Sequence, residues 1–202
     1  IRKTLIKFDD VMNDQRQVIF SQRLKILKNK NIEEILKDFL NEVLDNLEEI
    51  KNIYQKSNDE KSYLASMKNT TGNIINDKEL ISMTSLNKKE FGERIKSLYL
   101  NKKKERTNII GVEENDGLEK RIFLQIIDFA WRSHLQYLEQ LRQVIGLRSY
   151  GQKDPLSEFK KEAFTLFEGL LEKIKNDVIK FLFNLNIVIT ENNQDKVKKE
   201  EN

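Results

Sequence analysis

The sequence predicts an all-α fold built from long helices. The 202 residues include 34% charged and 38% hydrophobic side chains, but 7 glycines and 1 proline. Because glycine and proline disfavour helix interiors, a chain this poor in both favours long helices. Apolar residues also recur three and four positions apart over most of the chain, which places them on one face of a helix.

Composition and motifs exclude several classes of site. The net charge of +3 gives no case for nucleic acid over the whole surface, and the lack of cysteine excludes disulfides and thiolate metal sites and fits a reducing compartment. The sequence contains no apolar run that could span a bilayer and no signal peptide. GxxxxGK(S/T), GxGxxG and HExxH are absent too. We therefore expect no catalytic, cofactor-binding or metal site in this chain.

Residues 1–30 are predicted to form one amphipathic helix that packs a single stripe on a partner. Its apolar residues recur at seven-residue intervals at Leu5, Met12, Ile19 and Ile26. Asp9, Asp10, Asn13 and Arg16 lie within two turns on other positions. They form either a solvated face or an interface with another domain.

Residues 31–117 are predicted to form a smaller set of helices. Asn31 with Glu34, and Asn87 with Glu90, have the spacing of capping boxes, so a helix is expected after each asparagine. The first helix ends at the turn-forming residues 57–59. Residues 59–86 predict only short pieces, and Gly111 with residues 113–117 predicts a turn before the next helix.

A basic run at residues 102–106 (KKKER) follows the helix after Asn87. Long lysine side chains on the flank of a helix are usually solvated, and this is the favoured interpretation. A nucleic-acid patch is the alternative.

Residues 118–183 are predicted to form two antiparallel helices joined by a tight turn. Asp154 is a good N-cap, and Pro155 suits the first helical position, where its missing N–H costs nothing. Apolar residues on both sides of the turn share one helical face each, and we expect Phe159, Phe164 and Phe167 to be buried between the helices. His134 is expected to pack or hydrogen-bond there rather than act as a base or ligand. Residues 184–190 alternate as an extended segment would, and residues 191–202 are expected to be disordered.

The turn itself carries the candidate contact residues. Tyr150 lies between two glycines on a basic loop that includes Arg148 and Lys153. The tyrosine either folds back onto the hairpin or contacts a passing peptide through its amphipathic ring. Arg148 and Lys153 could also bind an anion, at a membrane surface or on a carboxylate.

Two segments resemble one family. WRSHLQYLEQLRQVIGLRSYGQKDPLSEFKKEAFTLF, from residue 131, is similar to the two-helix finger of SecA, the ATP-driven motor of bacterial protein export. IRKTLIKFDDVMNDQRQVIFSQR, from residue 1, resembles the long scaffold helix of the same family. The two matches lie in the family's order, about 100 residues apart. The region between them is similar to the helical wing in placement and only weakly in sequence.

The resemblance implies a domain organisation. A long scaffold helix would occupy residues 1–30, the wing 31–117, the two-helix finger 118–183, and an extended then disordered tail 184–202. Because the helical pattern is already running at residue 1, we expect the chain to be part of a longer protein. On the resemblance, two nucleotide-binding domains and a preprotein cross-linking domain would precede it.

The resemblance also implies a function. The finger would contact the translocating chain and the SecY channel through Tyr150, Arg148, Gln152 and Lys153, and would regulate ATP hydrolysis. Asp9, Asp10, Asn13, Arg16 and Arg142 would couple the segment to the motor domains, which are the part that binds ATP and Mg²⁺. The family's zinc-binding tail, which needs cysteine, does not occur in this sequence.

The partners implied are the SecY channel complex, unfolded preproteins, acidic phospholipid and the upstream motor domains, with a homodimer left open and no nucleic acid. The location implied is the cytoplasm, peripheral on the cytoplasmic face of the plasma membrane. A free-standing helical scaffold or adaptor without motor function is the alternative that the residues alone leave open.

Overall fold

The computed structural model describes residues 2–29, 32–147 and 154–188. All regular structure in these ranges is helical, which confirms the all-α prediction. The helices are α1 (Arg2–Lys28), α2 (Glu33–Ser57), α3 (Glu60–Thr71), α4 (Asp77–Ser82), the short 3-10 helix η1 (Met83–Ser85), α5 (Lys88–Ile110), α6 (Val112–Leu147) and α7 (Pro155–Asn184).

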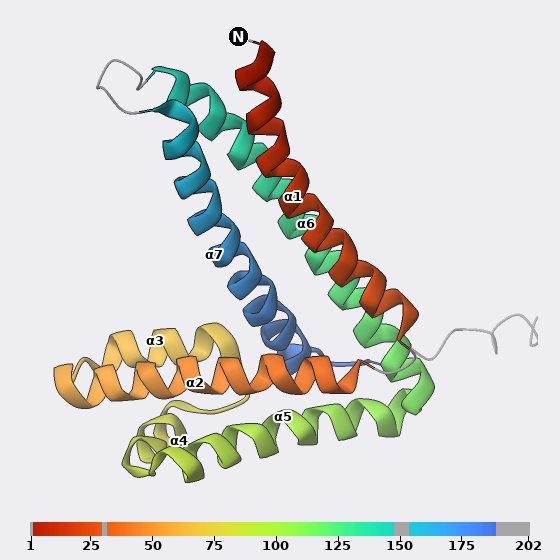
Figure 1. The fold of residues 1–202 in the computed structure, drawn as a ribbon. Coiled ribbons are helices and arrows are strands. Elements are labelled where there is room, and N and C mark those ends of the chain that lie inside the picture. The colour runs from red at the N-terminus through yellow and green to blue at the C-terminus, as the bar shows by residue number, and fades with distance from the viewer. Residues whose placement is uncertain (1, 30–31, 148–153, 189–202) are drawn as a thin grey trace, which may run out of the picture.

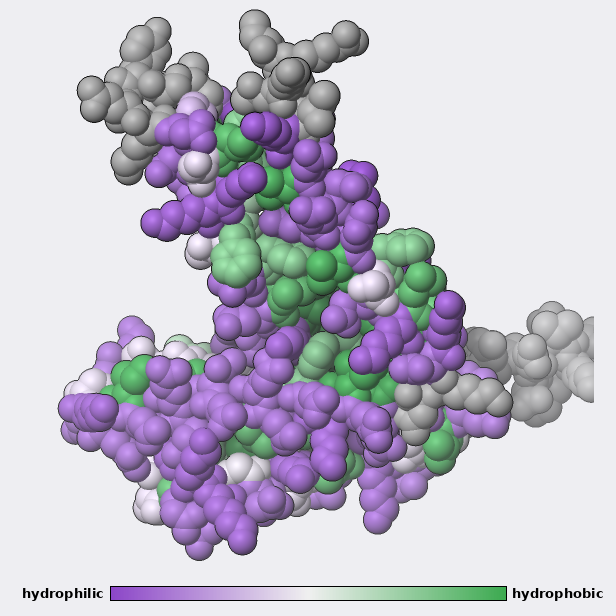
Figure 2. Space-filling model, viewed as in Figure 1, coloured by the Kyte–Doolittle hydropathy of each residue, from purple (hydrophilic) through white to green (hydrophobic). Residues whose placement is uncertain are grey.

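The helices form an arm and a wing that lies across the base of the arm (Figure 1). The arm consists of α1, α6 and α7, and the wing consists of α2 to α5. Within the arm, α6 packs on α7 and α1 packs on both, while α2 and α3 attach the wing to α7. Figure 2 shows a mainly hydrophilic wing surface and a strip of apolar surface along the arm.

Two separate hydrophobic clusters stabilise this arrangement. The larger one fills the wing and the base of the arm, where residues such as Leu40 and Phe91 meet Ile127 and Leu182. The smaller one lies in the distal half of the arm and includes Phe8, Leu138 and Phe159. Burying a large apolar side chain contributes about 1.5–3 kcal/mol, so the first cluster fixes the wing on the arm.

Of the two capping boxes predicted for the wing helices, one is confirmed and the other is wrong. Asn87 accepts a hydrogen bond from the Glu90 backbone N–H at 2.9 Å, and Glu90 accepts one from the Asn87 N–H at 3.3 Å, which confirms the capping box. The other capping box is wrong, because α2 begins at Glu33 with Ile32 as its N-cap and no side-chain cap bond. Asn31 lies outside the described residues. At the far end of α2, Asn58 adopts a left-handed conformation with φ 55°, as a turn there requires.

The break before α6 is sharper than the sequence predicts. Gly111 has φ +87° and donates its N–H to the Thr107 carbonyl at 2.9 Å, so the chain turns at this glycine. The predicted turn at residues 113–117 is wrong, because α6 already runs from Val112. Glu113 and Glu114 lie in its first turn, where acidic side chains stabilise a helix by interacting with the positive end of its dipole.

The third phenylalanine of the hairpin is also placed differently. Phe159 and Phe167 are buried, but Phe164 is 60% exposed. Residue 164 lies one position, about 100° of helix rotation, beyond Ala163 on the buried face, so its ring points away from α6. Past α7, residues 185–188 have no regular structure and Leu185 is extended, whereas Asn184, predicted to be extended, still belongs to the helix. Residues 189–202, which include the predicted disordered tail, lie outside the described residues.

The finger and its attachment to the long helix

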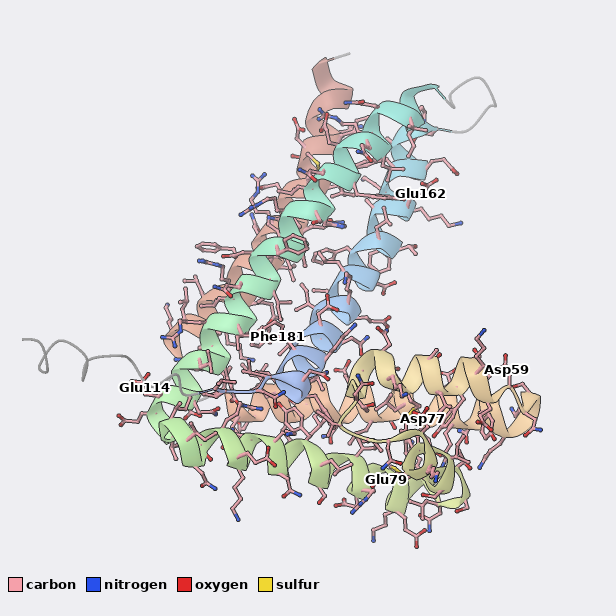
Figure 3. The ribbon with its side chains drawn as sticks, turned by 180° about the vertical axis from the view of Figure 1, so that it is seen from behind. Asp59, Asp77, Glu79, Glu114, Glu162 and Phe181 are labelled. Atoms are coloured by element: carbon pink, nitrogen blue, oxygen red, sulfur yellow. The ribbon has the colours of Figure 1, made fainter. Side chains whose placement is uncertain are left out.

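The two long helices α6 and α7 form the predicted antiparallel hairpin, which we call the finger. Asp154 caps α7 by accepting hydrogen bonds from the Ser157 backbone N–H at 3.1 Å and the Ser157 hydroxyl at 2.7 Å. These bonds hold the pKa of the Asp154 carboxyl below its usual range. Pro155 occupies the first turn as predicted. Figure 3 shows Glu162 on the distal half of α7 and Phe181 near the wing.

The predicted contact residues of the fingertip, Arg148, Tyr150, Gln152 and Lys153, lie outside the described residues. The helices that flank them are described, because α6 ends at Leu147 and α7 begins at Pro155. Both ends lie at the far end of the arm from the wing (Figure 1).

Aromatic packing joins α1 to the distal finger. The rings of Phe8 and Phe159 meet edge to face with centroids 4.8 Å apart. Leu138, Leu141, Ile145 and Ala163 complete the buried cluster around them. Of the seven-residue stripe predicted for α1, Met12 packs against this cluster and Ile19 and Ile26 are buried in the larger one, while the side chain of Leu5 is outside the described part.

The predicted coupling residues separate into two groups. Arg142 on α6 donates to Asp9 on α1 at 3.1 Å and to Glu139 at 2.7 Å, so one of the predicted acidic residues pairs with the predicted arginine. Asp10, Asn13 and Arg16 lie on the exposed side of α1 and contact neither finger helix through a hydrogen bond among the described residues. That side of α1 carries a polar surface available to another domain.

One further ion pair between α1 and the finger was not predicted. Arg23 binds both carboxylate oxygens of Asp128, at 2.9 and 3.2 Å. The sequence signal was weak, because 105 residues separate two charged residues that each look solvated in their own helix.

A buried polar group joins all three helices of the arm. The Nε2 of His134 on α6 lies 2.8 Å from the Oε1 of Gln15 on α1, and the Gln15 Nε2 donates to the Ala163 carbonyl on α7 at 3.0 Å. Both side chains are 7% exposed. Burial lowers the pKa of His134, so its neutral form is favoured at neutral pH. The prediction that His134 is a packing and hydrogen-bonding residue is confirmed.

A second buried polar network, centred on Arg106, lies where the wing meets the finger. Arg106 is 2% exposed and donates to the Leu182 carbonyl at 2.7 Å, to Glu119 at 2.9 Å and to Asn115 at 3.2 Å. This network contradicts the prediction of a solvated run at residues 102–106. Arg106 follows Tyr99 by seven residues and so shares its buried face, which is the signal that could have found it.

Two lysines of the basic run also form ion pairs. Lys102 pairs with Glu105 at 2.9 Å, and Lys103 lies 3.5 Å from Glu119. Three of its four cations therefore face acidic partners, which disfavours the interpretation as a nucleic-acid patch.

An apolar groove follows the finger between α6 and α7. It has a volume of about 530 Å³ and is lined by residues that include Ile126, Phe129, Tyr137, Leu166 and Leu170. Phe129 is 71% exposed at its edge.

The described residues hold no cluster of His, Asp or Glu side chains that could bind a metal ion. None of the helices in the described ranges has an apolar stretch of the length needed to cross a membrane.

Comparison with known proteins decides the family. Residues 1–186 match the model of the SecA wing and scaffold domain. The chain belongs to this family. The match runs from the long helix α1 through the finger.

This SecA wing and scaffold domain is similar to proteins named protein translocase subunit SecA. The chain is 47% identical over 188 residues to the SecA subunit of Pelagibacter ubique, and the aligned region covers 93% of this chain and 22% of that protein. The SecA subunits of Hyphomonas neptunium and Caulobacter vibrioides are each 35% identical, over 93% and 95% of this chain and 21% of their own lengths. The chain thus spans about a fifth of the length of the curated relatives it matches.

Proposed function

We propose that this chain is the mechanical segment of a SecA motor that couples ATP hydrolysis to pushing unfolded preproteins through the SecY channel. Its relatives are named protein translocase subunits and are more than four times as long as the chain. Because the sequence contains no phosphate-binding loop, ATP and Mg²⁺ would bind in the remainder of the motor. The segment alone is then non-catalytic.

The observation that carries the proposal is the construction of the finger. Its helices contain 36 and 30 residues, and the 30 residues of α7 span about 45 Å at 1.5 Å per residue. Both helices pack along α1, so the arm is a three-helix bundle rather than an isolated hairpin. Such a bundle transmits a displacement of its base to its tip with little bending, because close-packed interiors have low compressibility.

In this proposal the tip of the finger and the exposed side of α1 have different tasks. At the tip, Tyr150 grips the translocating chain, while Arg148, Gln152 and Lys153 contact the chain or the channel. Along α1, the exposed Asp10, Asn13 and Arg16 face the motor domains.

The remaining coupling residues, Asp9 and Arg142, hold the finger on the scaffold helix through their ion pair.

The motor would act in the cytoplasm, peripheral on the cytoplasmic face of the plasma membrane and in contact with acidic phospholipid. A homodimer stays an open alternative.

The test is Tyr150→Ala in the full-length translocase. We expect slower preprotein translocation with unchanged helical content and unfolding midpoint, because the proposed partner of Tyr150 is the translocating chain and not the hydrophobic core. Ile53→Ala is the control, since Ile53 is an exposed apolar residue of the wing on α2. Normal translocation by the Tyr150 variant would contradict the fingertip assignment and favour a helical scaffold without motor function.

A further inference from the structure

A single layer of polar groups crosses the arm at Gln15, His134 and Ala163. Gln15 contacts α6 through its Oε1 and α7 through its Nε2, at 2.8 and 3.0 Å. Among the described side chains of α1, it alone bonds to both helices of the finger. The ion pairs on either side of it, Asp9–Arg142 and Arg23–Asp128, are partly exposed and reach α6 only.

The chemistry of this layer permits one arrangement of hydrogen atoms. The Ala163 carbonyl can only accept, so the Gln15 side chain must present its NH₂ group to α7. Its oxygen then faces His134, and the histidine Nε2 must carry the proton that it donates. A reversed Gln15 amide would set two acceptors against each other at Ala163. The layer is therefore a directional donor chain from α6 to α1 to α7.

The polar layer also separates the two hydrophobic clusters of the molecule. Ile19, Ala130 and Phe167 belong to the cluster that continues into the wing. On the other side of the layer, Met12 and Leu138, three and four residues from Gln15 and His134, belong with Ala163 to the distal cluster. The distal arm is thus a packed unit that joins the rest of the protein across the polar layer.

The two kinds of contact constrain the arm differently. Apolar packing is non-directional, and cores tolerate repacking with loss of uniqueness before loss of stability. A buried polar group that can be satisfied in a single register excludes the alternatives, since each would leave a donor or acceptor unpaired. The layer therefore supplies what the two clusters lack, which is one fixed register of α1 against the finger.

We infer that Gln15 and His134 are positioning residues that set the register and angle of the distal finger on α1, and through them the position of the tip. This inference rests on the proposed function for its purpose, because a lever needs a fixed angle at its outer end. Its structural content can be measured without translocation.

The experiment is a pair of distance distributions between nitroxide labels on the full-length protein, with any cysteine outside this chain replaced by serine. The chain itself has no cysteine, so each label pair can be introduced alone. Exposed Lys7 and Lys160, both changed to cysteine, report the distal arm. Exposed Gln22 and Glu172, treated in the same way, report the base of the arm.

The variant is Gln15→Leu with His134→Leu, which replaces the polar layer by apolar side chains of similar size and leaves no buried group unpaired. We expect its distal distance distribution to broaden or split, while the basal distribution and the unfolding midpoint stay as in the wild type. Met12→Leu, in the distal cluster, should leave both distributions narrow. His134→Gln, made with Gln15 unchanged, keeps a hydrogen-bond donor for Gln15 and should keep the distal distribution narrow.

A distal distribution as narrow as that of the wild type in the double leucine variant would overturn the inference. So would equal broadening at both label pairs, because that is the sign of a merely stabilising role. Neither outcome depends on preprotein transport, so the inference can fail while the Tyr150 experiment succeeds, and the reverse.

Discussion

At the scale of single residues, His134 couples the arm to pH. Burial lowers the pKa of its imidazole in the folded protein, whereas the unfolded chain titrates near about 6.5. Below that pH the unfolded chain binds a proton that the folded chain does not. The free energy of unfolding therefore falls as the pH decreases, by at most about 1.4 kcal/mol per pH unit for one proton.

Urea unfolding at about pH 7 and about pH 5.5 measures this contribution, in a range above most carboxylate titrations. We expect the loss of stability between the two values to be smaller in the Gln15→Leu, His134→Leu variant than in the wild type. An identical loss in both proteins would show that His134 does not titrate as its burial requires.

Arg106 is the residue whose role the sequence concealed most completely. Removing a partner from a buried charged network leaves the other charge uncompensated, and such changes cost about 3–5 kcal/mol. We expect Arg106→Met to destabilise the chain by about that much, because the Leu182 carbonyl loses its donor and the buried Glu119 keeps only the longer contact with Lys103.

Lys104→Met is the matched control, since Lys104 is an exposed cation two residues away. Urea unfolding of the two variants should differ clearly, with Lys104→Met within about 0.5 kcal/mol of the wild type. Similar stabilities would mean that the buried network contributes nothing to the junction of wing and finger.

At the scale of elements, α7 shows how one helix uses two phenylalanines differently. Phe159 is fully buried and meets Phe8, whereas Phe164 is mostly exposed. We expect Phe159→Ala to lower the free energy of unfolding by about 3–5 kcal/mol, because it leaves a cavity in the distal cluster. Phe164→Ala should change it by about 0.5 kcal/mol or less, as surface substitutions do. Thermal or urea unfolding of both variants tests the helical phase directly, and a larger effect at Phe164 would contradict it.

The start of α5 offers a test of local sequence logic. The Asn87 side chain satisfies the Glu90 N–H, and loss of such a cap costs about 1 kcal/mol. We expect Asn87→Ala to lower stability by about that amount, while Asn101→Ala, at an exposed position within the same helix, should not. Equal effects in urea unfolding would assign the loss to helix propensity rather than to the cap.

The local signals of the helices were the predictable part of the structure. Helix spacing, the caps at Asn87 and Asp154 and the break at Gly111 depend on residues within a few positions of one another, so the sequence shows them. The turn predicted at residues 113–117 was wrong because it rested on local residue preferences alone. Glycine and asparagine weaken a helix, but they do not end it when the flanking turns are packed.

At the scale of the whole molecule, prediction was limited by contacts between distant segments. Gln15 and Ala163 are 148 residues apart, and Arg106 and Leu182 are 76 apart, so no local pattern relates them. Gln15 looks solvated in its own helix, and Arg106 shows its burial only through its spacing from Tyr99. The family resemblance indicated that scaffold helix, wing and finger occur together, but the buried groups that join them needed the structure.

The central claim is that the finger is a lever whose tip meets the translocating polypeptide. The most direct measurement places a photo-crosslinking amino acid at position 150 of the full-length translocase and stalls a preprotein in the channel. We expect cross-links from position 150 to the stalled chain, and none from position 53, on the exposed side of the wing. Absence of a cross-link at position 150, or equal cross-linking at position 53, would contradict it.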